Sequence, residues 1–268
     1  MANSNGIYLS VVSDDFGMCA PVNDGIVQAF TGGLLTDANL MAPCPAFIEA
    51  SRLARAHHIP VGIHATFTAE WDHLRWKPLT PLRSMIEPDG TFRRTVSDAW
   101  RDADLTEAAT ELDAQWDRIE SAGLAISHVS EHMGGDAKLA GLLKKKALQK
   151  KVAYRNFTLD GAQHDLPRYD LSSVLSTGQI SSDESIVRKR LEDWIESLGP
   201  GHHMWVTHCA VDHPSLAAIC EPTHHAVEWA RTYRMIDQTL VLDADIKARV
   251  ERRGIKRVPL SDCPRLGL

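Results

Sequence analysis

The sequence has little of what marks disulfide-rich, membrane-spanning or nucleic-acid-binding proteins. Its five cysteines are scattered and never form a Cys-x-x-Cys pair, which disfavours both a disulfide framework and a thiolate zinc site. No apolar run approaches the length needed to span a bilayer. Acidic residues (35) outnumber lysine and arginine (29), and the net charge of −6 disfavours nucleic acid or an anionic membrane surface as a partner.

The N-terminal residues lack the basic segment and apolar core of a secretory signal. Together with the unpaired cysteines, this predicts a cytoplasmic protein. The chain has 268 residues, of which 44% are hydrophobic and 24% charged, as in ordinary globular proteins. We therefore expect a single catalytic domain over residues 1–268, since no repeat or low-complexity tract divides the sequence.

Short apolar runs alternate with longer amphipathic ones. The expected strands are Ile7–Val12, Asp37–Met41, Val61–Thr66, Ala125–Val129, Val152–Phe157, Met204–Thr207 and Ile255–Pro259. The expected helices are Val22–Phe30, Pro45–Ala56, Leu105–Ala122, Ala137–Lys150, Glu184–Leu198 and Ala226–Leu242. This alternation predicts an α/β fold with a mostly parallel sheet. About seven strands favour an irregular β/α barrel, although periodicity does not separate it from an open sheet.

Two long segments, 69–104 and 159–182, break this alternation and are expected to be binding loops or surface insertions. The first contains Trp71, Arg75 and Trp76, which are candidates for substrate binding. Aromatic faces pack against the apolar C–H surfaces of sugar rings, so this cluster could form a sugar platform. The alternative is that the tryptophans are buried in the core.

Carboxylate and imidazole side chains fall at the carboxyl ends of four predicted strands. They are Asp14 and Asp15, His64, His128 and His132, and His208. In parallel α/β proteins, functional residues gather at this edge of the sheet. The aspartate pair alone fits a turn as well as a functional site, and each histidine alone is better explained as a packed or surface residue than as a ligand. Their joint placement favours a functional site.

One aspartate and two histidines from different strands are a standard set for a divalent metal with open positions for water and substrate. Such a metal lowers the pKa of bound water and polarises a carbonyl group. A second carboxylate could take a proton from that water, and a histidine across the site could protonate the leaving group. These roles suit the hydrolysis of an amide or an ester.

The motifs at these strand ends resemble those of the YdjC-like carbohydrate deacetylases, the family that includes chitooligosaccharide deacetylase. That family carries Asp-Asp-Phe-Gly, Gly-x-His, His-x-Asp-Ser-His and His-Pro-Gly in this order. The corresponding segments of this chain are residues 14–17, 62–64, 128–132 and 208–210. The first two match well. In the third, Ser130-Glu131 replaces Asp-Ser, and in the fourth, Cys209-Ala210 replaces Pro-Gly.

The resemblance implies an irregular β/α barrel that removes an acetyl group from an N-acetylated sugar or oligosaccharide. It implies that Asp15, His64 and His132 bind the metal. It also implies that Asp14 is the general base and that His208 serves the leaving group or the developing oxyanion. The expected cofactor is one divalent ion, zinc first, with magnesium, manganese or cobalt as alternatives. A homodimer is an oligomeric state that the resemblance allows.

The departures from the motifs leave alternatives open. A carboxylate that orients a ligand histidine is missing at Ser130, or Glu131 supplies it from another angle. Two other functions are therefore considered: a metal-dependent hydrolase of non-carbohydrate amides or esters, and a non-catalytic binding protein of the same fold. His128 is interpreted as a structural residue or a support for the ligands. Cys209 is not expected to be a nucleophile, because that chemistry needs a placed base.

Overall fold

One parallel sheet forms the centre of the protein in a computed structural model that describes residues 6–134, 136–154, 171–178, 180–224 and 226–262. Its strand order is β5-β4-β3-β2-β1-β7-β6, and β8 pairs with the first half of β1. The strands are β1 (Ile7–Phe16), β2 (Asp37–Leu40), β3 (Val61–Ala65), β4 (Ile126–Glu131), β5 (Ala153–Tyr154), β6 (Leu171–Ser176), β7 (Gly201–Thr207) and β8 (Lys256–Arg257). The central strand β1 is buried along almost its whole length.

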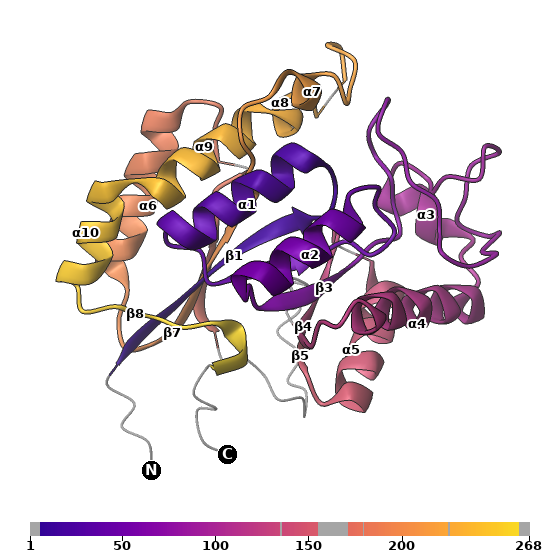
Figure 1. The fold of residues 1–268 in the computed structure, drawn as a ribbon, viewed down its shortest axis with the longest axis horizontal. Helices are drawn as coiled ribbons and strands as arrows, with labels where there is room; N and C mark the ends of the chain where they lie inside the picture. Colours follow the sequence, from indigo (N-terminus) through magenta and orange to yellow (C-terminus); the bar gives the residue numbers. More distant parts are fainter. Residues whose placement is uncertain (1–5, 135, 155–170, 179, 225, 263–268) are drawn as a thin grey trace.

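Helices connect the strands and cover the outside of the sheet. They are α1 (Ala20–Gly32), α2 (Phe47–His57), α3 (Val96–Arg101), α4 (Leu105–Ser121), α5 (Ala137–Lys150), α6 (Glu184–Ser197), α7 (Pro214–Ala217), α8 (Val227–Ala230), α9 (Thr232–Leu242) and α10 (Ala244–Arg252). Figure 1 shows α6, α9 and α10 together on one side of the molecule and α4 and α5 on the other, with β1 between them. Among the described residues, no helix has the length and apolar character needed to cross a membrane.

The expectation of a parallel α/β fold with about seven strands is confirmed. The sheet is a half-barrel. Its two end strands, β5 and β6, do not pair with each other among the described residues, so the barrel is not closed. Within the described part of the chain, β5 pairs only with β4, and β6 pairs only with β7. Because the strands are parallel, their carboxyl ends lie at one edge of the sheet, where the candidate residues were predicted to gather.

Several parts of the predicted secondary structure were wrong or incomplete, and helices α7 and α10 were not predicted. Strand β6 lies inside the segment 159–182, and its three serines and its exposed Val174 hide the apolar pattern of an edge strand. The single helix predicted over Ala226–Leu242 is divided into α8 and α9 at Arg231, whose φ and ψ of −135° and −58° are not helical. The segment 69–104 contains the short helix α3. Most of the predicted strand Val152–Phe157 beyond β5 lies outside the described residues.

A buried carboxyl group attaches the C-terminal segment to the sheet. Both oxygens of Asp37, at the start of β2, accept the backbone N–H of Leu260, and Thr36 Oγ1 donates to Oδ2 at 2.7 Å. Asp37 is fully buried, and this burial raises its pKa to about 7. The carboxyl group therefore holds its proton more strongly in the folded chain than in the unfolded one.

Asp37→Asn is expected to flatten the pH dependence of stability. Because the folded pKa lies above the unfolded value of 3.8, Asp37 contributes its stabilisation at low pH and loses it as the pH rises toward about 7. A difference of about three pKa units corresponds to about 4 kcal/mol. Urea unfolding at pH 5 and pH 8 should show a smaller loss of unfolding free energy in the variant. An equal loss in both proteins would contradict this assignment.

Candidate metal centre and active site

The end of β1 is irregular at the paired aspartates. The register between β1 and β2 shifts between Ser13 and Phe16, as in a β-bulge. Within this bulge Asp15 has a φ of 69°, a left-handed conformation that is uncommon for a residue other than glycine. A bulge redirects side chains at the end of a strand. It therefore allows Asp14 and Asp15 to point toward different neighbours.

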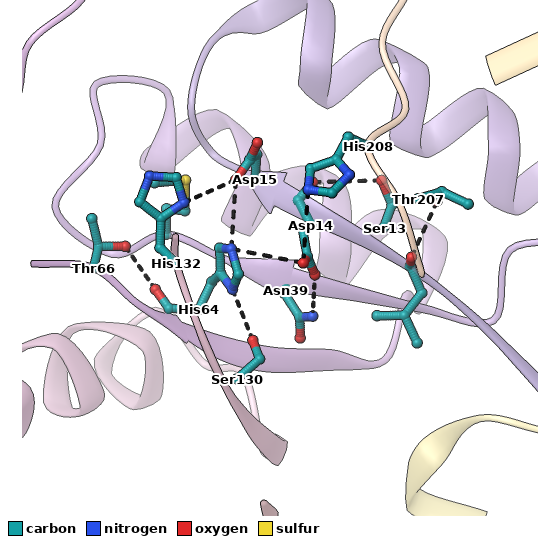
Figure 2. A network of polar contacts seen from close by, with 12 residues as sticks. Ser13, Asp14, Asp15, Asn39, His64, Thr66, Ser130, His132, Thr207 and His208 are labelled. Atoms are coloured by element: carbon teal, nitrogen blue, oxygen red, sulfur yellow. Dashed lines mark hydrogen bonds and ion pairs between the residues drawn. The ribbon is translucent and has the colours of Figure 1, made fainter. Parts of the chain in front are cut away.

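Asp15, His64 and His132 form a buried cluster at the carboxyl ends of β1, β3 and β4. One ligand atom from each residue lies within 4.8 Å of the other two. Asp15 Oδ1 is 3.5 Å from His64 Nε2 and 3.3 Å from His132 Nδ1. Figure 2 draws both contacts as dashed lines. No hydrogen bond within the described residues reaches this oxygen, although it is buried. A buried acceptor without a donor, facing two imidazole nitrogens, suits a divalent cation.

Ser130 fixes the orientation of His64. Its hydroxyl donates to the carbonyl oxygen of Ile63 at 3.1 Å and lies 2.8 Å from His64 Nδ1. Because the hydroxyl has only one proton, its oxygen accepts from Nδ1–H. This leaves the Nε2 lone pair directed at the cluster. The family's aspartate is absent here, but the serine supplies the hydrogen bond that a ligand histidine needs on its other nitrogen.

Glu70 supports the other ligand histidine. Its Oε2 lies 3.1 Å from His132 Nε2, on the far side of the ring from Asp15. Burial alone would lower the pKa of His132, but Glu70 and Asp15 outweigh it and raise the pKa to about 10. Trp76 packs edge-on against the same ring at a centroid distance of 6.0 Å. A carboxylate, a histidine and a metal position in line are a common arrangement in metal sites.

Arg234 of α9 contacts the cluster through the Asp15 oxygen that does not face the two histidines. It is buried, and its Nη2 donates to Asp15 Oδ2 at 2.7 Å. Burial would raise the pKa of Asp15, but Arg234 and the two cluster histidines hold it well below the usual range. Asp15 is therefore a carboxylate with one oxygen committed to Arg234 and the other directed at the histidines.

Asp14 and His208 lie beside this cluster. Asp14 Oδ2 is 3.9 Å from His64 Nε2 and 3.9 Å from His208 Nε2, and both contacts appear in Figure 2. The other oxygen of Asp14 accepts the side-chain N–H of Asn39 at 2.5 Å. The structure therefore brings together all five residues that the sequence predicted for metal binding and catalysis.

A buried carboxylate of α9 positions His208. Asp237 Oδ2 accepts the backbone N–H of His208 at 2.7 Å and lies 3.9 Å from its Nδ1. Asp237 is fully buried, and its Oδ1 accepts the hydroxyl of Thr177. The His208 ring also packs edge-on against Trp229, with the centroids 4.9 Å apart. These contacts fix both the backbone and the ring of His208.

A cavity of about 870 Å³ opens over the cluster. Asp14, Asp15, His64, His132 and His208 all line it. Its volume is typical of a site that encloses a small molecule or part of an oligosaccharide.

The predicted substrate-binding residues are distributed differently. Trp71 lines the cavity, and its role stays a prediction. Arg75 and Trp76 are not in the cavity lining: Arg75 donates to Thr91 and Phe92, and the indole N–H of Trp76 donates to the carbonyl oxygen of Thr68. The structure does not bring these three side chains together as an open platform.

Two other candidate residues are also placed. His128 is fully buried and hydrogen-bonds to Asn39, in agreement with a structural or supporting role. Cys209 is fully buried, and burial raises its pKa to about 12, so its thiol is not an activated nucleophile.

Sequence reasoning missed several side chains that contact the candidate residues, Trp229 among them. Four of them carry charge or an amide. They are Asn39, Glu70, Arg234 and Asp237. Arg234 and Asp237 are three residues apart within a predicted helix, so they share one face of it. The polar residues Arg234, Asp237 and Gln238 recur at helical spacing on one buried face of α9, and this spacing was a signal that the face packs against polar groups.

Comparison with known proteins agrees with this geometry. The model of the YdjC-like protein family matches residues 8–252, which is most of the chain. The chain belongs to this family. A carbohydrate deacetylase of Geobacillus stearothermophilus is 38% identical over 126 residues, or 47% of this chain and 49% of that protein. One of Thermoanaerobacter pseudethanolicus is 24% identical over 245 residues, or 89% of this chain and 92% of that protein.

The matches with higher identity are partial, and the chain spans about half or less of the length of the first carbohydrate deacetylases that it matches. A crystal structure from Enterococcus faecalis, described as a cellobiose-phosphate cleavage protein, has a TM-score of 0.78 at 22% identity. The match covers 95% of this chain and 98% of that one. At this identity the similarity shows the fold alone.

Proposed function

We propose that this YdjC-like protein is a metal-dependent hydrolase that removes an acetyl group from an N-acetylated sugar or oligosaccharide. The observation that carries the proposal is the position of Asp14 Oδ2, which lies 3.9 Å from an imidazole nitrogen on each side. One of these, His64 Nε2, belongs to the cluster that could hold a metal. The other, His208 Nε2, faces the same cavity. The relatives named carbohydrate deacetylases support the choice of an acetylated sugar.

Asp15, His64 and His132 would hold the metal, for which zinc suits two imidazoles and one carboxylate. A bound ion of this kind activates water and polarises the carbonyl group of an amide. Asp14 Oδ2 would accept the proton that the attacking water loses. His208 Nε2, held by Asp237 and Trp229 on its other side, would donate a proton to the amine that leaves.

The two histidines have different surroundings, and these suit different tasks. Burial lowers the pKa of His64, which keeps its ring neutral and able to bind a cation through Nε2. His132 has a carboxylate on each side, so its Nε2–H stays directed at Glu70 when Nδ1 binds a cation. Both rings are therefore held in orientations that suit metal ligands.

Acetate release with and without metal tests this function. The purified protein is treated with a chelator, dialysed and reloaded with zinc, magnesium, manganese or cobalt. Chitooligosaccharides are offered beside a panel of other acetylated amides and esters. We expect acetate release from the N-acetylated sugar to be lost with the chelator and to return best with zinc.

The same experiment separates the alternatives that the altered third and fourth motifs suggest. Hydrolysis of a non-carbohydrate amide or ester alone would favour the second hydrolase function. Absence of hydrolysis of every acetyl compound by the metal-loaded protein would favour a non-catalytic binding protein.

A further inference from the structure

Asn39 and His128 meet across the strand that carries His64. Asn39 on β2 is in register with Gly62 on β3, and His128 lies on β4, on the other side of β3. Asn39 Oδ1 and His128 Nε2 are 2.6 Å apart, and both residues are fully buried. Residues two apart on a strand share one face. The contact therefore lies on the same face of the sheet as His64, beside Gly62, two residues earlier on β3.

The glycine between them makes this contact sterically feasible. A Cβ atom added at Gly62 would lie closer than 3.0 Å to both Asn39 Oδ1 and His128 Nε2. Real Cβ atoms essentially never come so close to their neighbours. Gly62 therefore provides the space in which the amide and the imidazole meet, and any other residue would push them apart.

The amide of Asn39 connects this contact to Asp14. Its Nδ2 donates to Asp14 Oδ1 at 2.5 Å (Figure 2). A carboxylate only accepts hydrogen bonds, so the NH₂ end of the amide must face Asp14 and the oxygen must face His128. Since that oxygen has no proton to give, His128 Nε2 donates to it, whether Ser127 Oγ, which lies 2.9 Å from both His128 Nδ1 and the carbonyl oxygen of Val61, accepts from Nδ1–H or donates to Nδ1. The imidazole thus determines which end of the amide faces the carboxylate.

We infer that His128 acts through Asn39 as a positioning residue for Asp14. With Oδ1 held by the amide, the carboxylate presents Oδ2 toward His64 and His208. Without the donor on His128, the amide can turn its oxygen toward the carboxylate, which repels it. Asp14 then rotates away from the position in which Oδ2 reaches the reacting proton. This inference rests on the proposed role of Asp14 as the general base.

Two amide variants of His128 that differ in reach test the inference. In His128→Gln, the longer side chain places an N–H near the position of the imidazole Nε2, whereas in His128→Asn the amide is too short to reach Asn39. We expect His128→Asn to lower kcat roughly 10- to 100-fold, as is usual for the loss of a supporting hydrogen bond. KM and metal content should stay near those of the native protein. His128→Gln should recover most of the lost kcat.

His202→Asn is the matched control. His202 is also a buried histidine on a strand, but it lies near the start of β7 and hydrogen-bonds to Ser10. Loss of this imidazole should leave kcat unchanged. Equal kcat in His128→Asn and the native protein, or equal losses in the Asn and Gln variants of His128, would overturn the inference.

Crystal structures of the two His128 variants give a readout that does not depend on the substrate. In His128→Asn, the hydrogen bond between Asn39 Nδ2 and Asp14 Oδ1 should be broken and the carboxylate rotated. In His128→Gln, both should be retained. An unmoved Asp14 in His128→Asn would overturn the inference even if the native protein were active. Inactivity of the native protein on acetyl compounds would instead contradict the proposed function.

Discussion

Asp14→Asn is expected to abolish most of the acetate release while leaving metal binding intact. The amide keeps the shape of the carboxylate and can still accept the Asn39 N–H through its oxygen. The position of Oδ2 is then occupied by an NH₂ group, which cannot take a proton. Loss of a general base costs roughly 100- to 10,000-fold in kcat. The metal cluster is unaffected, because its carboxylate comes from Asp15.

The measurement combines steady-state kinetics with elemental analysis of the same preparation. Asp24→Asn, which changes an exposed carboxylate on α1, is the control for loss of one negative charge and should be fully active. Full activity of Asp14→Asn would contradict the role of Asp14. Loss of both metal and activity would mean that Asp14 belongs to the ligand set instead, and the division of the aspartate pair would be wrong.

The division of that pair is an example of what the sequence can and cannot predict. Two carboxylates at the end of a buried strand are unusual, and the histidines at other strand ends indicated a shared site. The separate directions of Asp14 and Asp15 depend on a bulge and a positive φ, which no periodicity reveals. The roles therefore came from the resemblance, and the bulge gives a physical reason why the two residues have different neighbours.

The supporting side chains were harder to predict because they come from distant parts of the chain. Asn39 was hidden in a predicted strand, where a polar residue is most simply explained as exposed. Glu70 lies in a segment with little periodicity. Arg234 and Asp237 reach the site only because α9 packs beside β7 and α1. Pairing of this kind depends on tertiary packing, which local patterns do not encode.

Trp76 illustrates the opposite error. Two tryptophans in an irregular segment suggested a surface for a sugar ring. Both are almost fully buried, although Trp71 lines the cavity and its role stays a prediction. Trp76 packs against His132 and so supports a candidate ligand without lining the cavity. A loop that lacks periodic hydrophobic residues can still cover a core, and its large aromatic side chains are then the groups that fill it.

Alanine at His64 or His132 is expected to remove both the metal and the activity. Each change deletes one of three candidate ligands, and the remaining two cannot hold the ion tightly. His132→Ala also removes the ring that separates Glu70 from Asp15, so two buried carboxylates then lie near each other. Their repulsion should raise the pKa of at least one of them. We expect the larger effect on stability from this variant.

Ser130→Ala tests the hydrogen bond that orients a metal ligand, without removing the ligand itself. This variant retains all three ligands but loses the acceptor for His64 Nδ1–H, so zinc affinity should fall only about 10- to 100-fold. Added zinc should therefore restore its activity, whereas the two alanine variants of the ligands should stay inactive at any zinc concentration.

His203→Ala controls for the loss of a buried histidine elsewhere. Its Nδ1 lies 2.9 Å from Ser173 Oγ near the start of β7, so the variant should keep both metal and activity. Isothermal titration with zinc and acetate release measure the whole series. Zinc binding by His132→Ala equal to that of the native protein would show that the ion, if bound, lies elsewhere. The geometry predicts that zinc binding is lost in the two ligand variants, weakened in Ser130→Ala and unchanged in His203→Ala.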